Sequence, residues 1–433
     1  MRLTKIGTAI AAAAMAALAA GCSSSGSSTA SPGTSPAAST GSPAASAATA
    51  SAATGTPIKL MVDTTMTPAA ALGGLSFPYP AVTAKAAAAA LNKDGGIDGH
   101  PVQIDVCDNQ GNPNQSAACG RQAKSNGDIA VIGSWDVTGA AVILPVLQAE
   151  GIPYIGALAA SPAEVTNPDA FIFDPGAVLA SYATAAMWSD EGCKNVVEFG
   201  VSGNPAFAQE LAGQQKIAAK DGYQLHVVNI QVAQTDVSAP ISTALSMHPD
   251  CVTYEGDGQT TAKLVAGVRQ AGYTGKFITA IGSLLPQLLA SIGKAGDGVL
   301  VLNTTLSPYA DDPQVTQFRN EVTAYVGNAK AAAVDLNEFG QDGWSSVRLV
   351  DLALSGTGNY TSAELLKKLP TMCDVNVGNV YPHVSFCKPS VQSTVFPRIF
   401  NAYEAYFVAK NGVYVPLPGQ TWHDVSVDVQ QGT

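Results

Sequence analysis

The stretch of sequence that decides the fold is LNKDGGIDGHP, residues 91–101. A predicted alanine-rich helix at residues 79–92 runs into it, and two adjacent glycines, Gly95 and Gly96, follow. Glycine adopts positive φ without steric cost and commonly ends helices. A run of apolar and β-branched residues at 102–108 begins directly after Pro101. The stretch therefore predicts a tight turn that joins a helix to a buried strand.

Outward from this turn, strands and helices alternate along most of the chain. Strands are predicted at residues 58–63, 102–108, 129–133, 153–157, 171–173, 195–199, 225–230, 251–254, 276–281 and 298–302. Helices are predicted at residues 79–92, 114–125, 139–150, 177–189, 206–221 and 260–271. Continuous apolar strands that alternate with helices are typical of a parallel sheet covered on both faces. The pattern predicts a doubly wound α/β fold that occurs twice and forms two lobes.

The alternation weakens after residue 304. Helices are predicted at 314–326, 340–354 and 362–369, followed by short extended pieces near 384–386 and 395–399. We expect these segments to return to the two lobes. The expected organisation is lobe 1 at 58–174, lobe 2 at 175–304, a return to lobe 1 at 305–370, and a C-terminal return segment, mainly to lobe 2, at 371–433.

The first 21 residues predict a signal peptide. Arg2 and Lys5 precede an apolar run at residues 6–20 that is too short and too alanine-rich for a membrane span. The run ends in Leu-Ala-Ala-Gly-Cys, which resembles the lipobox of bacterial lipoproteins, whose cysteine is acylated. An ordinary signal peptide with a chance cysteine is the alternative. We expect the mature chain to begin at Cys22 and to be held at the membrane surface by lipid.

Residues 22–57 predict a tether. After Cys22 this stretch contains almost only Ser, Ala, Thr, Gly and Pro and no charged residue. Such a composition cannot bury enough apolar surface to fold, and a flexible chain of this length reaches about 30 Å.

Charge and scattered polar residues limit the possible functions. The net charge of −11 argues against nucleic acid, which requires clustered Lys and Arg. The five histidines show no metal-ligand spacing, and no phosphate-binding glycine loop occurs. Ser202 lies on a predicted strand-to-helix turn, but the second glycine of a nucleophile elbow is missing. We expect no metal, no cofactor and no enzymatic activity.

Six cysteines remain when Cys22 is set aside, and an even number in an exported protein indicates disulfides. Local spacing suggests the pairs Cys107–Cys119 and Cys373–Cys387. Cys193 and Cys251 then pair by elimination, and each lies at the start of a predicted strand.

Four segments in order carry a family resemblance. Residues 91–101 resemble the INxxGGIxGxP signature of substrate-binding proteins for branched-chain amino acid ABC transporters. Residues 108–113, DNQGNP, are similar to the DDxxxP entry to the next helix; residues 129–134 and 144–153 resemble the strand VxAVIGxxxS and the segment xxPVxxxxGIP. The similarity is clear over the first lobe and thin after residue 326. It implies a type I periplasmic binding protein fold, with three crossings between the lobes and a ligand in the cleft.

The resemblance also implies candidate ligand-binding residues in the first lobe. Ser134 is expected to offer its hydroxyl and nearby amides to a ligand carboxylate, or else to cap the next helix. Trp135 is expected either to line the pocket or to pack. Ala159 and Ser161 occupy the stretch after the fourth strand, where a hydroxyl role falls to Ser161. Two further residues, Phe77 and Tyr79, are expected at the mouth of the cleft.

In the second lobe the match is weaker. Phe207 stands where the family commonly has a tyrosine over the ligand. Glu255 and Asp257 are candidates for an ammonium group, although each is also explained as a solvated loop carboxylate. Gly282 lies where amino-acid binders of the family carry an acidic partner for the ammonium, and no carboxylate occurs there. Phe339, beside Glu338, is expected near the hinge or simply buried with its helix.

Together these observations predict a monomeric, lipid-anchored receptor on the extracytoplasmic cell surface. It would capture a small amino-acid- or amide-like ligand and deliver it to an ABC permease. One alternative is a sensory or regulatory module with the same fold and no role in transport. A second alternative is a surface hydrolase that depends on Ser202.

Overall fold

The turn after the first helix has the predicted form in the computed structural model, which describes residues 53–433 apart from 73, 202–204, 232–233, 379–380 and 419–421. Helix α1 (Tyr79–Lys93) ends there, and Gly96 has a φ of +70°. A Cβ atom at this position would stand 2.1 Å from the carbonyl oxygen of His100, so a side chain cannot be accommodated. The turn leads directly into strand β2 (Val102–Asp108).

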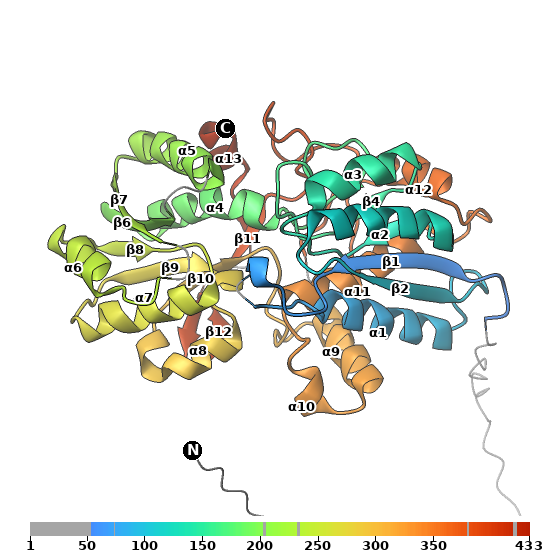
Figure 1. The fold of residues 1–433 in the computed structure, drawn as a ribbon, viewed down its shortest axis with the longest axis horizontal. Helices are drawn as coiled ribbons and strands as arrows, with labels where there is room; N and C mark the ends of the chain where they lie inside the picture. The colour runs from blue at the N-terminus through green and yellow to red at the C-terminus, as the bar shows by residue number, and fades with distance from the viewer. Residues whose placement is uncertain (1–52, 73, 202–204, 232–233, 379–380, 419–421) are drawn as a thin grey trace, which may run out of the picture. The chain divides into compact units, whose positions relative to one another are not determined.

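The first lobe is built on a five-stranded parallel sheet with the strand order β2-β1-β3-β4-β5 (Figure 1). The remaining strands are β1 (Ile58–Thr64), β3 (Ala130–Ile132), β4 (Tyr154–Ile155) and β5 (Ala170–Phe171). Along β1, Leu60 and Val62 belong to one hydrophobic core and Met61 to another, because successive side chains point to opposite faces. Helices α2 (Pro113–Asn126) and α3 (Ala140–Ala149) cover one face, and α1 covers the other.

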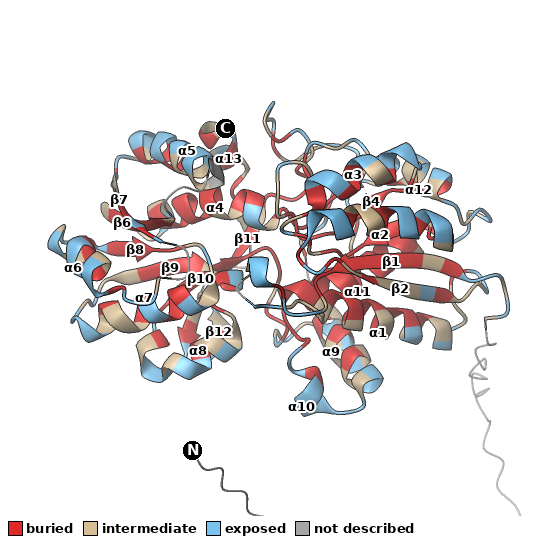
Figure 2. Cartoon of the chain, in the orientation of Figure 1, coloured by how far each residue is buried: buried red, intermediate tan, exposed pale blue. Residues whose placement is uncertain are grey.

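The second lobe contains an eight-stranded sheet whose main order is β12-β11-β10-β9-β8-β6-β7. The parallel strands are β6 (Asn195–Val201), β7 (Gln224–Ile230), β8 (Cys251–Thr253), β9 (Lys276–Ala280) and β10 (Leu300–Asn303). Its helices are α4 (Gly176–Asp190), α5 (Pro205–Asp221), α6 (Ser238–Ser246), α7 (Gly258–Gln270) and α8 (Pro286–Ile292). Figure 2 shows that the central strands of both sheets are buried, whereas the edge strands β2 and β7 are only partly buried. The two-lobed α/β fold predicted from the sequence is confirmed.

After β10 the chain returns to the first lobe. Helices α9 (Pro313–Val326), α10 (Ala329–Ala332), α11 (Glu338–Leu354) and α12 (Ser362–Lys368) follow. Helix α11 packs directly on α1, as Figure 1 shows. A Cβ atom at Gly343 of α11 would stand 2.2 Å from the carbonyl oxygen of Pro80, so the two helices approach as closely as a glycine allows.

Three segments connect the two sheets: the chain after β5, the chain after β10 and the chain before β11 (Tyr403–Lys410). The first and third are hydrogen-bonded to each other. The Asn401 side chain donates to the carbonyl oxygen of Phe173 at 3.0 Å, and the Arg398 guanidinium donates to that of Ala170 at 2.8 Å. These bonds tie together segments that are more than two hundred residues apart in the sequence.

The C-terminal expectations were partly wrong. Residues 395–399 form no strand, and Val384 makes only an isolated bridge to Val375. Strands β11, β12 (Val413–Pro416) and β13 (His423–Asp424) come later, and helix α13 (Ser426–Gly432) follows them. Strand β11 is antiparallel to both β10 and β12, so the second sheet is mixed rather than fully parallel. An extended segment becomes a strand only where a sheet edge is free to pair with it, and sequence does not reveal that edge.

Three disulfides join Cys107 to Cys119, Cys193 to Cys251, and Cys373 to Cys387; the first and third are the pairs suggested by spacing, and the second is the pair left by elimination. Cys193 precedes β6 and Cys251 begins β8, and these strands are paired neighbours in the second sheet. This disulfide therefore links residues that lie 58 positions apart across one sheet.

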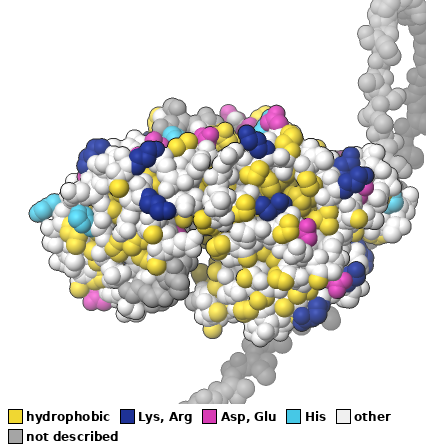
Figure 3. Space-filling view, turned by 90° about the horizontal axis from the view of Figure 1, so that it is seen from above, with side chains coloured by type: hydrophobic (Ala, Val, Ile, Leu, Met, Phe, Trp, Pro, Cys, Tyr) yellow, Lys and Arg dark blue, Asp and Glu magenta, His cyan; other side chains and the backbone are white. Residues whose placement is uncertain are grey.

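The predicted signal peptide, Cys22 and nearly all of the expected tether lie outside the described residues. None of the described helices combines the length and the apolar character needed to cross a bilayer. On the face shown in Figure 3, Lys and Arg side chains are spread out rather than gathered into one patch.

The disulfides yield a stability prediction. Replacing both Cys193 and Cys251 with alanine should lower the free energy of unfolding by about 1 kcal/mol more than the same change at Cys373 and Cys387, because the closed loop is longer (58 against 14 residues). Denaturant unfolding of the two double variants measures the difference. Equal losses, or a larger loss for the second pair, would contradict the loop-length argument.

Candidate functional site

Four aromatic side chains gather beyond the carboxyl ends of the first-lobe strands. Phe77 and Tyr79 lie at the start of α1, Trp135 follows β3, and Phe339 lies in the first turn of α11. The ring centroid of Phe339 is 5.4 Å from that of Phe77, 6.1 Å from that of Tyr79 and 5.2 Å from that of Trp135. We call these four residues the aromatic cluster. Three of its members are partly exposed and Phe339 is buried, so the cluster presents an apolar surface to the space beside it.

Ser134 lies next to this cluster and is buried. Its hydroxyl oxygen accepts a 3.3 Å hydrogen bond from the backbone N–H of Asp63, at the end of β1. It does not cap α3; instead, the Asp136 carboxylate accepts from the backbone N–H of Gly139, the residue before that helix. The alternative explanation of Ser134 as a helix cap is therefore wrong.

Ala159 and Ser161 follow β4, and Ala159 is fully buried. The backbone N–H of Ser161 donates to the Glu164 carboxylate at 2.9 Å, and its hydroxyl stands 3.4 Å from the same oxygen. Tyr154 also donates to Glu164, at 3.2 Å. Burial raises the pKa of Glu164 to about 8. Ser161 is thus part of a small internal network around Glu164.

Phe207 lies in the first turn of α5 and is half-buried. Its ring packs over Gly200, where a Cβ atom would stand 2.5 Å from the ring carbons. Ser202, the residue on which the hydrolase alternative depends, lies outside the described residues.

The two candidate carboxylates of the second lobe have internal partners. Glu255 accepts hydrogen bonds from the hydroxyls of Ser181, at 3.1 Å, and Thr184, both on α4. Asp257 caps α7, where it accepts from the backbone N–H of Thr260 at 2.9 Å. Burial raises the pKa of Glu255 to about 7. Neutral hydroxyls therefore bind Glu255, which is not the solvated loop carboxylate of the alternative explanation.

Gly282 lies in the short helix η2 (Ile281–Ser283) of the second lobe and meets a carboxylate from elsewhere in the chain. A Cβ atom at Gly282 would stand 2.6 Å from Oε1 of Glu338, the first residue of α11. The sequence showed no carboxylate at this position, and the structure supplies one from a residue 56 positions away in the chain.

Glu338 belongs to a group of buried acidic residues at the crossings between the sheets. Asp174 accepts from the backbone N–H of Gly176 at 2.9 Å, and the Tyr381 hydroxyl is hydrogen-bonded to Asp342. Burial raises the pKa of Asp174 to about 6 and that of Glu338 to about 8. Burial, reinforced by neighbouring carboxylates, holds the pKa values of Asp342 and Glu404 well above their usual range.

Sequence reasoning missed most of this acidic group, which we name the acidic centre: Asp174, Glu338, Asp342 and Glu404. Its members come from the loop after β5, from α11 and from β11. They are far apart in the sequence, so no spacing links them. The position of Glu338 beside Phe339 was the one available signal.

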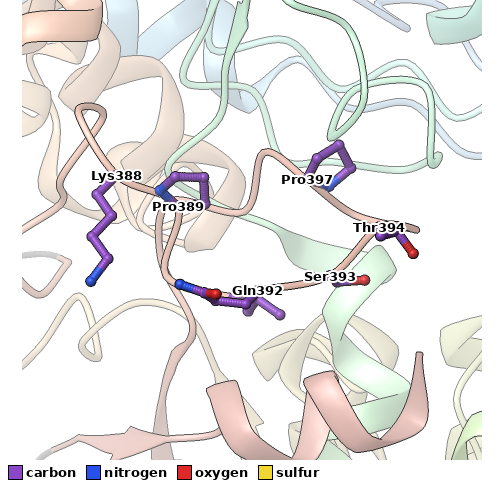
Figure 4. A pocket seen from close by; sticks show the side chains of 7 residues that line it. Lys388, Pro389, Gln392, Ser393, Thr394 and Pro397 are labelled. Carbon is purple, nitrogen blue, oxygen red and sulfur yellow. The ribbon is translucent and has the colours of Figure 1, made fainter.

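The pocket drawn in Figure 4 lies elsewhere. It measures about 370 Å³ and is lined by residues of the loop 388–397, including Lys388, Gln392 and Ser393. None of the predicted site residues lines it. The candidate site is therefore defined by the aromatic cluster, Ser134 and the acidic centre rather than by an enclosed cavity.

One group in the described part of the chain has its atoms close enough for a metal site: Cys193, Asp250 and Cys251. Both cysteines belong to a disulfide, so their sulfurs are not thiolates and do not act as metal ligands.

The family model described as periplasmic binding protein matches residues 57–386. No curated protein sequence matches the chain.

Several solved structures share the fold at low sequence identity. A leucine-binding protein of Thermotoga maritima is 17% identical, with a TM-score of 0.65, over 83% of this chain and 97% of that one. An R. palustris solute-binding protein in complex with 4-hydroxybenzoate is 17% identical, with a TM-score of 0.69, over 86% and 98%. A fatty acid ABC transporter substrate-binding protein from Thermomonospora curvata is 16% identical, with a TM-score of 0.69, over 88% and 97%. At these identities the likeness concerns the fold alone.

The raised pKa of Glu338 yields a pH prediction. The folded state keeps a proton on this carboxyl up to about pH 8, whereas the unfolded chain releases it near its ordinary pKa of 4.5. Its contribution to stability is therefore fully present below about pH 4.5 and is lost as the pH rises through about 8. The groups that face Glu338 and whose pKa values are also raised are Asp174, Asp342, Tyr381, Glu404 and Tyr414.

We expect the melting temperature of the ligand-free protein to fall between about pH 5 and pH 8, and we expect Glu338→Gln to make that fall shallower. Thermal unfolding in a series of buffers measures both slopes. The control is Glu150→Gln, which removes a carboxylate from an exposed ion pair with Lys124 and should leave the slope unchanged. A slope that is identical in the Glu338→Gln variant would contradict the assignment.

Proposed function

Because the chain belongs to the periplasmic binding protein family, we propose that it captures a small amino-acid- or amide-like ligand between its two lobes and delivers it to an ABC permease. The observation that carries the proposal is the position of the aromatic cluster and Ser134, beyond the carboxyl ends of the first-lobe strands. Ligands of open α/β sheets bind at those ends. Members of this family bind solutes and do not transform them, so the chain is not an enzyme.

Binding would proceed by closure of the lobes on the ligand. A ligand that contacts both lobes stabilises the closed form over the open one. The approach of Gly282 to Glu338 supports this proposal, because it brings a loop of the second lobe against the helix that carries Phe339. The chain segments at the crossings would act as the hinge.

The aromatic cluster would provide the apolar part of the binding surface. Aromatic rings bury a large area at a small cost in side-chain entropy, and three of these four rings are partly exposed. Ser134 would add a hydroxyl, and Phe207 would cover the ligand from the second lobe without a polar group of its own.

We also propose that Cys22 is acylated and anchors the protein at the extracytoplasmic surface. The basic start, the short apolar run and the Ala-Gly-Cys sequence support this assignment. The uncharged segment after Cys22 would then give the lobes room to open, to close and to reach the permease.

Ligand capture can be tested with the full-length chain in a thermal shift assay against amino acids and their amides. A true ligand should raise the melting temperature progressively with its concentration, because it binds the folded state alone. Ser134→Ala should weaken binding about ten-fold, as expected for the loss of a hydrogen bond to a charged group, and Phe207→Ala should weaken it as well. Ser291→Ala, at an exposed position of α8, is the matched control. The absence of any shift across the panel would contradict the proposal.

The anchor can be tested by changing Cys22 to Ser in the full-length chain expressed in a bacterial host. We expect the unchanged protein in the membrane fraction, with an acylated N-terminal peptide by mass spectrometry. The Cys22→Ser variant should leave that fraction, whereas a Ser23→Ala control should stay. Retention of the Cys22→Ser variant at the membrane would show that another feature holds it there.

A further inference from the structure

Asp63 is a buried carboxyl group at the carboxyl end of β1. It is 0% exposed, and neither of its carboxyl oxygens has a hydrogen-bond donor among the described residues. The Asp136 carboxyl and the Asn109 side-chain amide lie against it. Burial of an ionised carboxylate without donors is costly, so this position requires either a proton on Asp63 or a charged partner.

Asp136 presents a free oxygen at the same place. Its Oδ1 atom accepts from the backbone N–H of Gly139 at 2.8 Å, whereas Oδ2 has no donor in the part of the chain that the structure describes. The side chain is 1% exposed. A Cβ atom at Gly139 would stand 2.6 Å from this Oδ2 and 2.0 Å from the Ser116 hydroxyl oxygen, so the packing here is tight. The free oxygens of Asp63 and Asp136 thus meet in a closely packed interior.

No base faces this pair. The ion pairs found within the described ranges include neither Asp63 nor Asp136. The titratable groups around the pair are Asp108, Tyr154 and Glu164, all of them acids. Two carboxyl groups in contact do not both ionise, because the charges repel, so one keeps its proton and donates it to the other. Burial, reinforced by Asp136, raises the pKa of Asp63 well above its usual range, which makes Asp63 the protonated member.

The pair lies behind the connection between β3 and α3, residues 133–139, which we call the binding turn. This turn carries Ser134 and Trp135. The backbone N–H of Asp63 donates to the Ser134 hydroxyl at 3.3 Å, and the residue after Asp63 makes an isolated parallel bridge to Trp135. A bond between the side chains of Asp63 and Asp136 would add a further link between β1 and the same turn.

We propose that Asp63 and Asp136 share one proton and that this hydrogen bond positions the binding turn for the ligand. Asp63 is a positioning residue in this proposal, because it acts on the ligand through Ser134 and Trp135. The consequence for binding rests on the proposed function, whereas the shared proton and its effect on the turn do not. Hydrogen bonds from a hydroxyl to a carboxylate are about twice as strong as neutral ones, which suits this role.

The shared proton makes the binding turn sensitive to alkaline pH. The folded state holds the proton on Asp63 well above the ordinary pKa of 3.8, so its stabilising contribution is greatest at acidic pH and is lost as the pH rises through the raised pKa. Loss of the proton would bring two negative charges into contact and push the turn away from β1. The Asp63→Asn side chain donates an N–H to Asp136 at every pH, so this variant should keep the turn in place.

Hydrogen exchange tests the turn without a ligand. Mass spectrometry of the full-length chain at pH 7 follows the backbone amides of residues 133–139. Asp63→Leu has a side chain of similar size and no donor, and it should raise exchange in this segment about ten-fold, as expected for the loss of one hydrogen bond. Asp63→Asn should exchange like the unchanged protein. The control is Asp94→Asn, at an exposed aspartate of the first lobe.

Infrared spectroscopy tests the proton itself. Asp63→Asn removes the protonated carboxyl, and Asp136→Asn supplies an amide donor that allows Asp63 to ionise. Both variants should therefore lose one protonated-carboxyl C=O stretch at pH 7 in difference spectra against the unchanged protein, and Asp94→Asn should lose none. If Asp63→Leu does not fold, these two variants still decide whether the proton is shared.

The effect on binding is measured by thermal shift with L-leucine and L-leucinamide. Asp63→Leu should weaken the affinity of a compound that binds by about ten-fold, and Asp63→Asn should not. Equal affinity in these two variants would overturn the role in positioning, as would equal hydrogen exchange. Difference spectra without a lost stretch would show that both carboxylates are ionised and would overturn the shared proton. If neither compound stabilises any of the proteins, the result counts against the proposed function, while exchange and infrared spectra still decide this inference.

Discussion

The contact between helices α1 and α11 is the constraint on which the site depends. At Gly343 the backbone of α11 approaches the carbonyl oxygen of Pro80 so closely that any side chain would collide. This contact fixes the N-terminal turn of α11, and with it Glu338 and Phe339, beside the carboxyl ends of the first-lobe strands. Helix α11, which lies more than two hundred residues after β1 in the sequence, thereby completes the surface that begins at the ends of β1 and β3.

The acidic centre shows how the fold concentrates charge where it joins the two sheets. Asp174 and Asp342 are partly satisfied by Tyr381 and by backbone donors, whereas Glu404 and Glu338 lack such donors among the described residues. Buried carboxylates of this kind destabilise the ligand-free protein as the pH rises. Proteins tolerate such an arrangement when an external group provides the missing interaction.

The aromatic cluster and the acidic centre have different origins in the sequence. Phe77 and Tyr79 could be singled out in advance because they stand at the start of the first predicted helix, and Trp135 because it follows a predicted strand of the first lobe. Glu255 could be singled out in the same way, but its hydroxyl partners on α4 could not. Ser134 could be placed at its turn, whereas only the folded structure distinguishes its bond to Asp63 from a helix cap.

The sequence by itself determined the alternation of strands and helices and the turn at residues 91–101, and it suggested the two short disulfides, because these depend on local conformation and short-range spacing. The tertiary structure alone decided which sheet edge receives the C-terminal strands and which carboxylate meets Gly282. Both depend on contacts between residues far apart in the chain, which no local pattern encodes. The physical reason is that pairing at a sheet edge and burial of a charge are properties of the packed molecule.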